Sequence, residues 1–217
     1  MNRWRVAVLV VAVLLLCEAQ AKADSTIVLT FEGIGNVVSI GNYYNGGAGG
    51  NLGITFGPES LAVVSVLNGG GGNFANAPSG HTIAFFLNGV GDVMNVAGGF
   101  NTGFSFFYSA TTNPGTVTVW SGLDGTGTLL ATLTLPPNGL CTPAPNFCHW
   151  TAEGVTFAGT AESVNFSGTA NEIGFDNLTL GSATAGGGPA QASEPATLFL
   201  LGAGSLGLLG VRRKRLA

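Results

Sequence analysis

Lysine and arginine occur only near the two ends of this chain, which limits the electrostatic interactions that the middle of the chain can form. These residues are Arg3, Arg5, Lys22, Arg212, Arg213, Lys214 and Arg215. Because no lysine or arginine lies between Lys22 and Arg212, the middle cannot form salt bridges with such side chains. It also offers no basic surface to neutralise phosphates, so nucleic-acid binding of that kind is excluded. Each basic end flanks an apolar run, so the charge pattern divides the chain into two terminal signals and a passenger.

Residues 1–23 have the features of a secretory signal peptide. Arg3 and Arg5 precede the apolar run from Val6 to Leu16, and Ala21-Lys22-Ala23 is a small-x-small cleavage site. We expect export through the general secretion machinery and cleavage by signal peptidase after Ala23. An uncleaved anchor is the alternative, but the apolar run is short for a bilayer span.

Residues 193–217 form a second segment directed to the membrane. Ser193-Glu194-Pro195-Ala196-Thr197 precedes an apolar run over residues 198–211, and a basic tail, residues 212–217, ends the sequence. As a helix, the run with Ala196 and Thr197 would be roughly 24 Å long, against a hydrocarbon core of about 30 Å. The tail would stay on the cytoplasmic side of the inner membrane and place the passenger outside. Such a marginal span suits temporary retention.

This order of motif, short Gly/Leu-rich span and basic tail resembles the PEP-CTERM sorting signal of Gram-negative bacteria. Ser193 stands where that family usually has a first proline, whereas Glu194 and Pro195 match. The resemblance implies that Ser193, Glu194 and Pro195 form the sorting motif and that Arg212, Arg213, Lys214 and Arg215 form a basic stop signal. It also implies an exosortase-type membrane transpeptidase as partner, and sorting to the cell surface or extracellular space. A simple C-terminal membrane anchor is the alternative.

Residues 24–181 have the pattern of one all-β passenger domain, which a Gly/Ala-rich linker, residues 182–192, follows. Short runs rich in β-branched and aromatic residues alternate with Gly, Asn and Pro. About nine to ten strands at this spacing predict an antiparallel, jelly-roll-like β-sandwich. The predicted fold adds an N-terminal signal helix and a C-terminal membrane helix. The predicted strands are residues 25–31, 61–67, 82–87, 104–108, 116–120, 129–135, 154–157, 163–166 and 173–180.

Two cysteines remain in the passenger after the signal peptide, with Cys17, has been removed. Cys141 and Cys148 flank a short segment that contains Pro143 and Pro145. In an exported domain, a pair this close predicts a local disulfide, with two free thiols as the alternative. His149 follows Cys148, but we expect no metal site here, because no fourth ligand stands at the spacing of a known zinc motif.

Two further groups are candidates for ligand binding. Glu32 follows the first predicted strand and Asp176 with Asn177 lies in the last, so their oxygens suit a structural calcium ion if these strands are neighbours. The alternative is that both carboxylates are solvated or are capped by backbone amides, and no other cofactor is expected. Tyr43 and Tyr44 lie in a Gly/Asn-rich loop, where exposed rings could stack on a sugar. Packing of the loop is the alternative.

The predicted function is that of an exported surface or extracellular-matrix protein without catalytic activity. His81 and His149 stand outside any H-E-x-x-H or serine-elbow context. The segments 120–127 and 173–180 resemble strands of PEP-CTERM passenger domains and, more loosely, of carbohydrate-binding jelly rolls. The alternative function is therefore a secreted carbohydrate-binding module of jelly-roll type, with polysaccharide as its partner.

Overall fold

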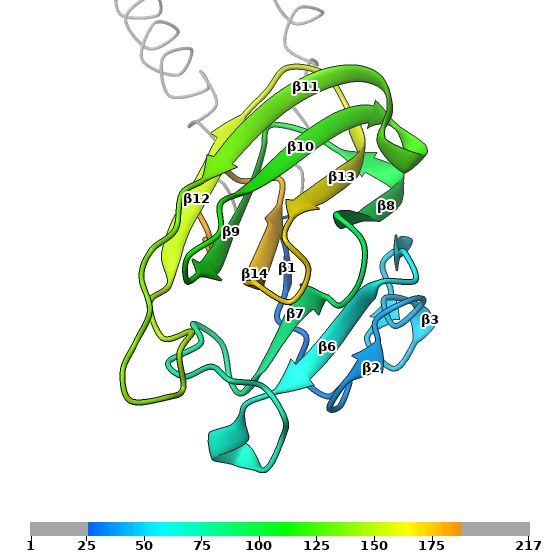
Figure 1. Cartoon of the computed structure of the whole chain (residues 1–217). Coiled ribbons are helices and arrows are strands. Elements are labelled where there is room, and N and C mark those ends of the chain that lie inside the picture. Colours follow the sequence, from blue (N-terminus) through cyan, green and yellow to red (C-terminus); the bar gives the residue numbers. More distant parts are fainter. Residues whose placement is uncertain (1–25, 188–217) are drawn as a thin grey trace, which may run out of the picture. The chain divides into compact units, whose positions relative to one another are not determined.

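The computed structural model describes residues 26–187, which form an all-β domain built from antiparallel sheets (Figure 1). This confirms the predicted all-β, antiparallel class. The predicted signal helix, sorting motif and membrane helix lie outside the described residues. Within residues 26–187, no helix has the length and apolar character that a membrane crossing needs.

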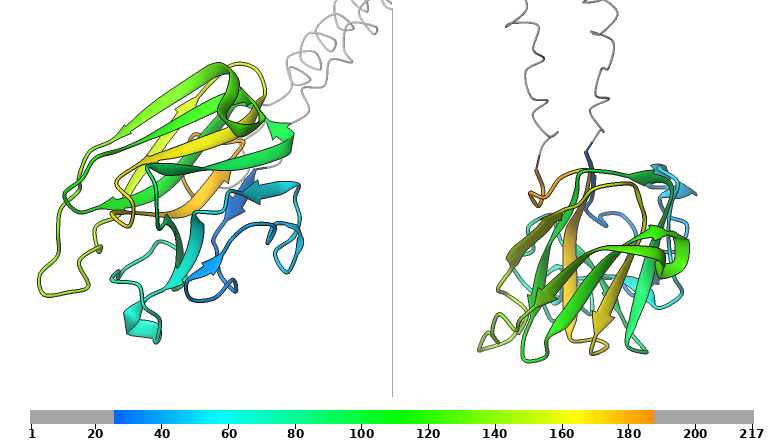
Figure 2. Two further views of the ribbon diagram at one scale, coloured as in Figure 1. Left: turned by 45° about the vertical axis from the view of Figure 1, so that its right-hand side comes forward. Right: turned by 90° about the horizontal axis from the view of Figure 1, so that it is seen from above.

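The first sheet has the strand order β12-β9-β14-β7-β6-β2, and β1 also pairs with β14. Its strands are β1 (Ile27–Leu29), β2 (Val38–Ser39), β6 (Ser60–Val64), β7 (Thr82–Phe86), β9 (Gly103–Ala110), β12 (Thr151–Thr156) and β14 (Ile173–Leu180). The first and last described strands are therefore direct neighbours, with Ile27 opposite Leu180. Both ends of the described chain consequently lie at the same end of the domain (Figure 2).

The second sheet has the strand order β11-β10-β13-β8-β5 and lies over the first (Figures 1 and 2). Its strands are β5 (Ile54–Phe56), β8 (Gly91–Phe100), β10 (Gly115–Gly122), β11 (Thr126–Leu135) and β13 (Ala161–Gly168). A separate ribbon pairs β3 (Asn45–Gly47) with β4 (Gly50–Asn51). Two short 3₁₀ turns, η1 (Val66–Asn68) and η2 (Leu123–Gly125), complete the described elements.

Aromatic side chains fill the space between the two sheets. Phe106 of β9 is fully buried and lies near Phe166 of β13 and Phe175 of β14, with ring centroids 6.5 and 5.7 Å away. Phe166 and Phe175 meet edge to face across the sheets at 4.9 Å. On β10 the strand alternation buries Val117 and Val119 in this core. Burial of these apolar faces is the main force that holds the two sheets together.

Each of the nine predicted runs overlaps a strand, but residues 26–187 form fourteen strands, more than predicted. The longest omission is β8, whose Gly91, Gly98 and Gly99 and polar Asn95 resemble a loop in sequence. Its pairing with β13 and β5 nevertheless buries Met94 fully. Tertiary pairing overrides local propensity here, because sheet formation depends on cross-strand neighbours. The other omissions, β2 to β5, are only two or three residues long.

Candidate functional site

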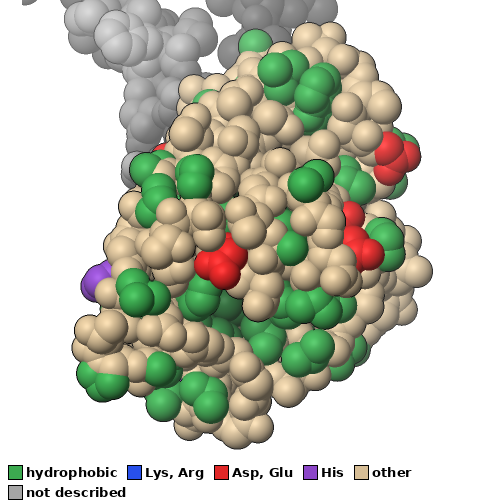
Figure 3. All heavy atoms as spheres, viewed as in Figure 1, with side chains coloured by type: hydrophobic (Ala, Val, Ile, Leu, Met, Phe, Trp, Pro, Cys, Tyr) green, Lys and Arg blue, Asp and Glu red, His purple; other side chains and the backbone are tan. Residues whose placement is uncertain are grey.

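A groove lies on the outer face of the first sheet, over β6, β7 and β14. On β7, alternation directs Ala84 and Phe86 into the main core, whereas Ile83 and Phe85 belong to a second apolar cluster. Together with Leu87, these two residues line a cavity of about 370 Å³. Val63 of β6, which is opposite Ile83, and Ile173 and Gly174 of β14 extend the apolar lining. Figure 3 shows hydrophobic side chains gathered in a hollow at this level of the face.

One wall of the groove is formed by two loops that bind each other. The amide of Asn73 donates to the Asn146 side-chain oxygen at 2.6 Å, and the backbone nitrogen of Asn146 donates to the Asn73 side chain at 3.0 Å. The backbone of Phe147 donates to the carbonyl of Asn73 at 3.1 Å and accepts from Ala75 at 3.0 Å. These bonds hold Phe147 beside Phe74, so both rings line the groove.

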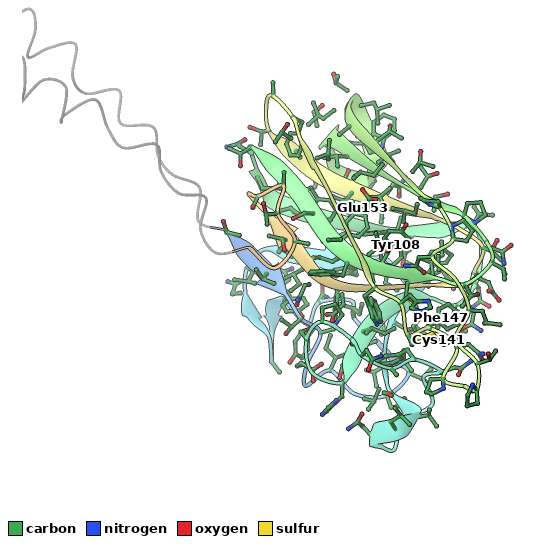
Figure 4. All side chains as sticks on the ribbon, turned by 90° about the vertical axis from the view of Figure 1, so that its left-hand side faces the viewer. Tyr108, Cys141, Phe147 and Glu153 are labelled. Atoms are coloured by element: carbon green, nitrogen blue, oxygen red, sulfur yellow. A yellow bond between two sulfur atoms is a disulfide. The ribbon has the colours of Figure 1, made fainter. Side chains whose placement is uncertain are left out.

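A disulfide between Cys141 and Cys148 closes the second of these loops, with the Cα atoms 6.1 Å apart. Figure 4 shows Cys141 and Phe147 on this loop, near the end of the strands that carry Tyr108 and Glu153. Asn146 bridges the loop internally by donating its side-chain amide to the carbonyl of Cys141 at 2.9 Å. The segment that carries Phe147 is therefore fixed by a covalent bond and by hydrogen bonds.

The polar rim of the groove consists of amides and one carboxylate. Asn73, Asn171 and Glu172 line the groove, and Glu172 is its only charged lining residue. Asn171 has a φ of 60°, in the left-handed region that asparagine tolerates, and its backbone donates to the carbonyl of Phe86 at 2.9 Å. Residues 26–187 contain no lysine or arginine that could pair with this carboxylate, which accepts the hydroxyl of Thr111 at 3.4 Å. The groove therefore suits a neutral ligand with apolar faces and hydroxyl groups.

The structure places the two predicted sugar-contact tyrosines away from this groove. Tyr44 is buried and packs against Phe31 and Phe56, and its hydroxyl accepts the backbone N–H of Phe31 at 3.0 Å. Burial raises the pKa of Tyr44 to about 12. The predicted ligand contact is therefore wrong for Tyr44, which packs the loop into the core instead. Tyr43 is half-buried, and its hydroxyl donates to the carbonyl of Glu32 at 3.0 Å.

The predicted calcium residues come together around the segment 79–82. Glu32 accepts from the backbone nitrogens of His81 and Thr82 at 2.8 and 2.7 Å. Asp176 accepts from the backbone and hydroxyl of Ser79 at 2.8 and 2.7 Å and from the backbone of Asn177 at 2.7 Å. Both carboxylates thus act as backbone caps, and calcium binding there stays a proposal. A thermal melt with and without millimolar calcium tests it.

Asp176 is fully buried, and this burial raises the pKa of its carboxyl group to about 6. Hydrogen bonds from Ser79 and Asn177 oppose the shift, and the charge of Glu32 adds to it. Since the pKa in the folded state exceeds the ordinary value of 3.8, protonation favours folding. This contribution is complete below the ordinary pKa and is lost as the pH rises through about 6.

We therefore expect the free energy of unfolding to fall by about 2 kcal/mol when the pH is raised from 4.5 to 7.5 and Asp176 ionises. Urea denaturation at the two pH values measures this difference in the wild type. Asp176→Asn should remove the contribution, because the amide keeps an acceptor for Ser79 and does not titrate. An equal pH dependence in both proteins would contradict the assignment.

The groove residues Asn73, Phe85, Phe147, Asn171 and Glu172 were not among those predicted from the sequence. One signal was present: residues 82–87 are apolar at nearly every position after Thr82, which indicates a strand covered on both faces. The cover on the outer face comes from segments far along the chain, so neither the groove nor its wall follows from local pattern.

The C-terminal segment matches the model of the PEP-CTERM protein-sorting motif over residues 191–215. No curated protein matches the chain. This match overlaps the predicted motif, membrane span and basic tail, with a boundary within a few residues of the predicted one.

Several solved structures show a loose likeness to the domain. A glycoside hydrolase family 43 arabinoxylan arabinofuranohydrolase from Bacillus subtilis is 21% identical, with a TM-score of 0.36 over 56% of this chain and 24% of that chain. CsCBM6-3 from Clostridium stercorarium, solved with cellobiose, is 15% identical, with a TM-score of 0.37 over 57% and 82%. The K1 cleaved adhesin domain of Lys-gingipain from Porphyromonas gingivalis is 13% identical, with a TM-score of 0.39 over 72% and 97%.

TM-scores at this level assign no ligand to this chain, and the chain spans only 24% of the hydrolase. The sorting motif is the specific finding, because a family model matches it residue by residue over 191–215. The chain is an exported protein that carries a PEP-CTERM protein-sorting motif over residues 191–215.

Proposed function

We propose that the passenger domain is a non-enzymatic binding module of the cell surface or extracellular matrix, of jelly-roll type, and that it holds a neutral polysaccharide in the groove. In this proposal the segment 198–211 anchors the protein in the inner membrane only until sorting. The observation that carries the binding role is the groove itself, with its apolar floor, two flanking phenylalanine rings and amide rim.

The chemistry of the groove matches a sugar chain. A pyranose ring has a mostly apolar C–H face and a hydroxylated edge, so it needs an apolar surface with a few directed polar groups. Phe85 and Phe147 supply rings at the floor and the wall, and the Asn171 amide can both donate and accept. The Asn73 amide is already bonded to Asn146, so it offers a sugar only its second N–H and its second lone pair. A cavity of about 370 Å³ accommodates a short stretch of such a chain.

The charge of the domain favours a neutral glycan as the ligand over an acidic one. Residues 26–187 carry no lysine or arginine, and the rim contributes the carboxylate of Glu172. An acidic polysaccharide would meet this negative charge without a compensating cation, which disfavours its binding. A neutral polysaccharide has no such penalty.

The position of the groove along β14 suits a displayed binding site. Ile173 and Gly174, which line the groove, begin β14, whereas Leu180 ends it and pairs with Ile27. A strand of this length spans roughly 25 Å. The groove therefore lies at the start of β14. The chain continues toward its sorting motif from the other end of this strand.

We expect Phe85→Ala to weaken binding of a neutral polysaccharide about tenfold, equivalent to about 1.4 kcal/mol. Asn171→Gly, which keeps the left-handed backbone and removes the amide, should weaken it by a smaller factor. Affinity electrophoresis of the full-length protein in detergent, in gels containing neutral or acidic polysaccharides, measures the effect. Leu129→Ala changes an exposed residue of β11 and serves as the control.

Retardation by acidic polysaccharides alone would contradict the proposed ligand class. Equal retardation of the Phe85→Ala and Leu129→Ala proteins would contradict the groove as the site. Thermal melts of each variant show whether a loss of binding reflects unfolding.

A further inference from the structure

The disulfide and the histidine that follows it form a cluster that the proposed glycan site does not use. Cys141, Cys148 and His149 each offer one ligand atom, and these atoms all lie within 4.8 Å of one another. The two sulfurs are half-buried and the imidazole is exposed, so solvent reaches the cluster. We propose that this cluster is a redox-gated zinc site, which is closed as the disulfide and binds Zn²⁺ once the disulfide is reduced.

The spacing between sulfur and imidazole already matches that of two ligands on one metal ion. The sulfur of Cys141 lies 3.7 Å from Nδ1 and 3.6 Å from Nε2 of His149. Zinc bonds of about 2.3 Å to sulfur and about 2.0 Å to nitrogen, at tetrahedral angles, separate two such atoms by roughly 3.5 Å. Because the sulfur is almost equidistant from the two nitrogens, the exposed imidazole has to rotate about its side-chain bonds to direct one lone pair at an ion shared with Cys141.

The second sulfur can reach the same ion without a rearrangement of the backbone. Two cysteine sulfurs on one tetrahedral zinc ion are roughly 3.8 Å apart. The Cα atoms of Cys141 and Cys148 are 6.1 Å apart, a distance from which rotation of the two side chains can produce that separation. The fourth coordination position stays open to water, because no further His, Cys, Asp or Glu of the described chain joins the cluster.

Hydrogen bonds hold the loop together independently of the disulfide. The backbone of Cys141 donates to the carbonyl of Asn146 at 3.0 Å, and the Asn146 amide donates back to the carbonyl of Cys141 at 2.9 Å. Asn146 is in turn tied to Asn73 of the neighbouring loop. Reduction therefore leaves the three ligands close together, which lowers the entropic cost of gathering them around a metal ion.

The carbonyl of Gly139 favours the tautomer that a metal ion needs. Nδ1 of His149 lies 3.4 Å from this carbonyl oxygen. A proton on Nδ1 would point to the carbonyl and leave the lone pair of Nε2 available for zinc, as in many zinc sites.

An external thiol is the reductant that opens the disulfide and makes the zinc site available. Two thiol molecules reduce the Cys141–Cys148 disulfide to two cysteine thiols and are oxidised to one disulfide. Zinc then replaces the two thiol protons, which pass to solvent, while neutral His149 supplies a lone pair. In the oxidised protein both sulfurs are bonded to each other, so no thiolate is available as a ligand.

Zinc titration of the full-length protein in detergent, in competition with a chromophoric chelator, tests the proposal. A water-soluble phosphine reduces the disulfide, takes the oxygen of water to become its oxide, and adds no competing thiol. We expect one zinc ion per reduced chain and no competitive binding by the oxidised chain. Cobalt substitution should add a sulfur-to-metal absorption band to the reduced protein, because thiolates coordinate the ion.

His149→Ala should weaken zinc binding at least about tenfold, because it removes one of three protein ligands. His81→Ala removes the chain's other histidine and should bind like the wild type. Cys141→Ser removes one of the two thiolates and should weaken the sulfur-to-cobalt band, and a thermal melt establishes that each variant is folded. Equal zinc affinity of the His149→Ala and His81→Ala proteins, or equal affinity of the oxidised and reduced chains, would overturn the proposal.

Discussion

Phe106→Ala is expected to lower the free energy of unfolding by about 3–5 kcal/mol, which is the largest effect of any single substitution considered for this domain. Phe106 is fully buried, and its ring lies near those of Phe104, Tyr108, Phe166 and Phe175. These neighbours come from three strands in both sheets, so they cannot close the cavity by moving together. The loss combines the burial of the ring with the cost of the cavity.

Urea denaturation followed by circular dichroism measures the loss. Leu129→Ala, on the exposed face of β11, is the matched control and should change stability by less than about 0.5 kcal/mol. A similar small change for both variants would show that Phe106 does not link the two sheets as the structure indicates.

Removal of the disulfide is the second large expected effect, with a cost of about 2.5 kcal/mol when both cysteines are replaced by serine. Cys141 and Cys148 are separated by seven positions, and the chain-entropy model gives about this value for so short a loop. The loop also carries Phe147 and the wall of the groove. Binding of a neutral polysaccharide should therefore weaken more than the loss of stability alone explains.

Thermal melts and affinity electrophoresis of the Cys141→Ser, Cys148→Ser double variant separate the two consequences. At a temperature where this variant is fully folded, retained wild-type affinity would show that hydrogen bonds between Asn73 and Asn146 suffice to hold the wall. The wild type treated with phosphine provides the comparison without a change of sequence, provided that zinc is excluded.

Most of the strands followed from the sequence because their signal is local. The alternation of Thr116 to Trp120 directs Val117 and Val119 inward wherever the neighbouring strands lie. β8 did not follow, because its glycines and asparagine have little strand propensity of their own. Only pairing with β13 and β5 gives that segment its extended conformation.

The residues predicted to bind calcium show what can and what cannot be inferred from the sequence. Adjacent terminal strands were anticipated, and β1 does pair with β14. The sequence could not show that Ser79, His81 and Thr82 would approach the two carboxylates and donate hydrogen bonds to them. Tyr44 was placed on a loop, as it is, but its burial depends on contacts with Phe31 and Phe56 across the fold.

The sequence by itself identified the sorting motif of this protein, because such a signal is a linear pattern of charge and apolar length. It also determined the all-β class, because strand periodicity repeats every two residues. Only the tertiary structure decided where a ligand could bind. The groove and its disulfide-closed wall combine residues from Val37 to Gly174, and their proximity results from packing that no local pattern encodes.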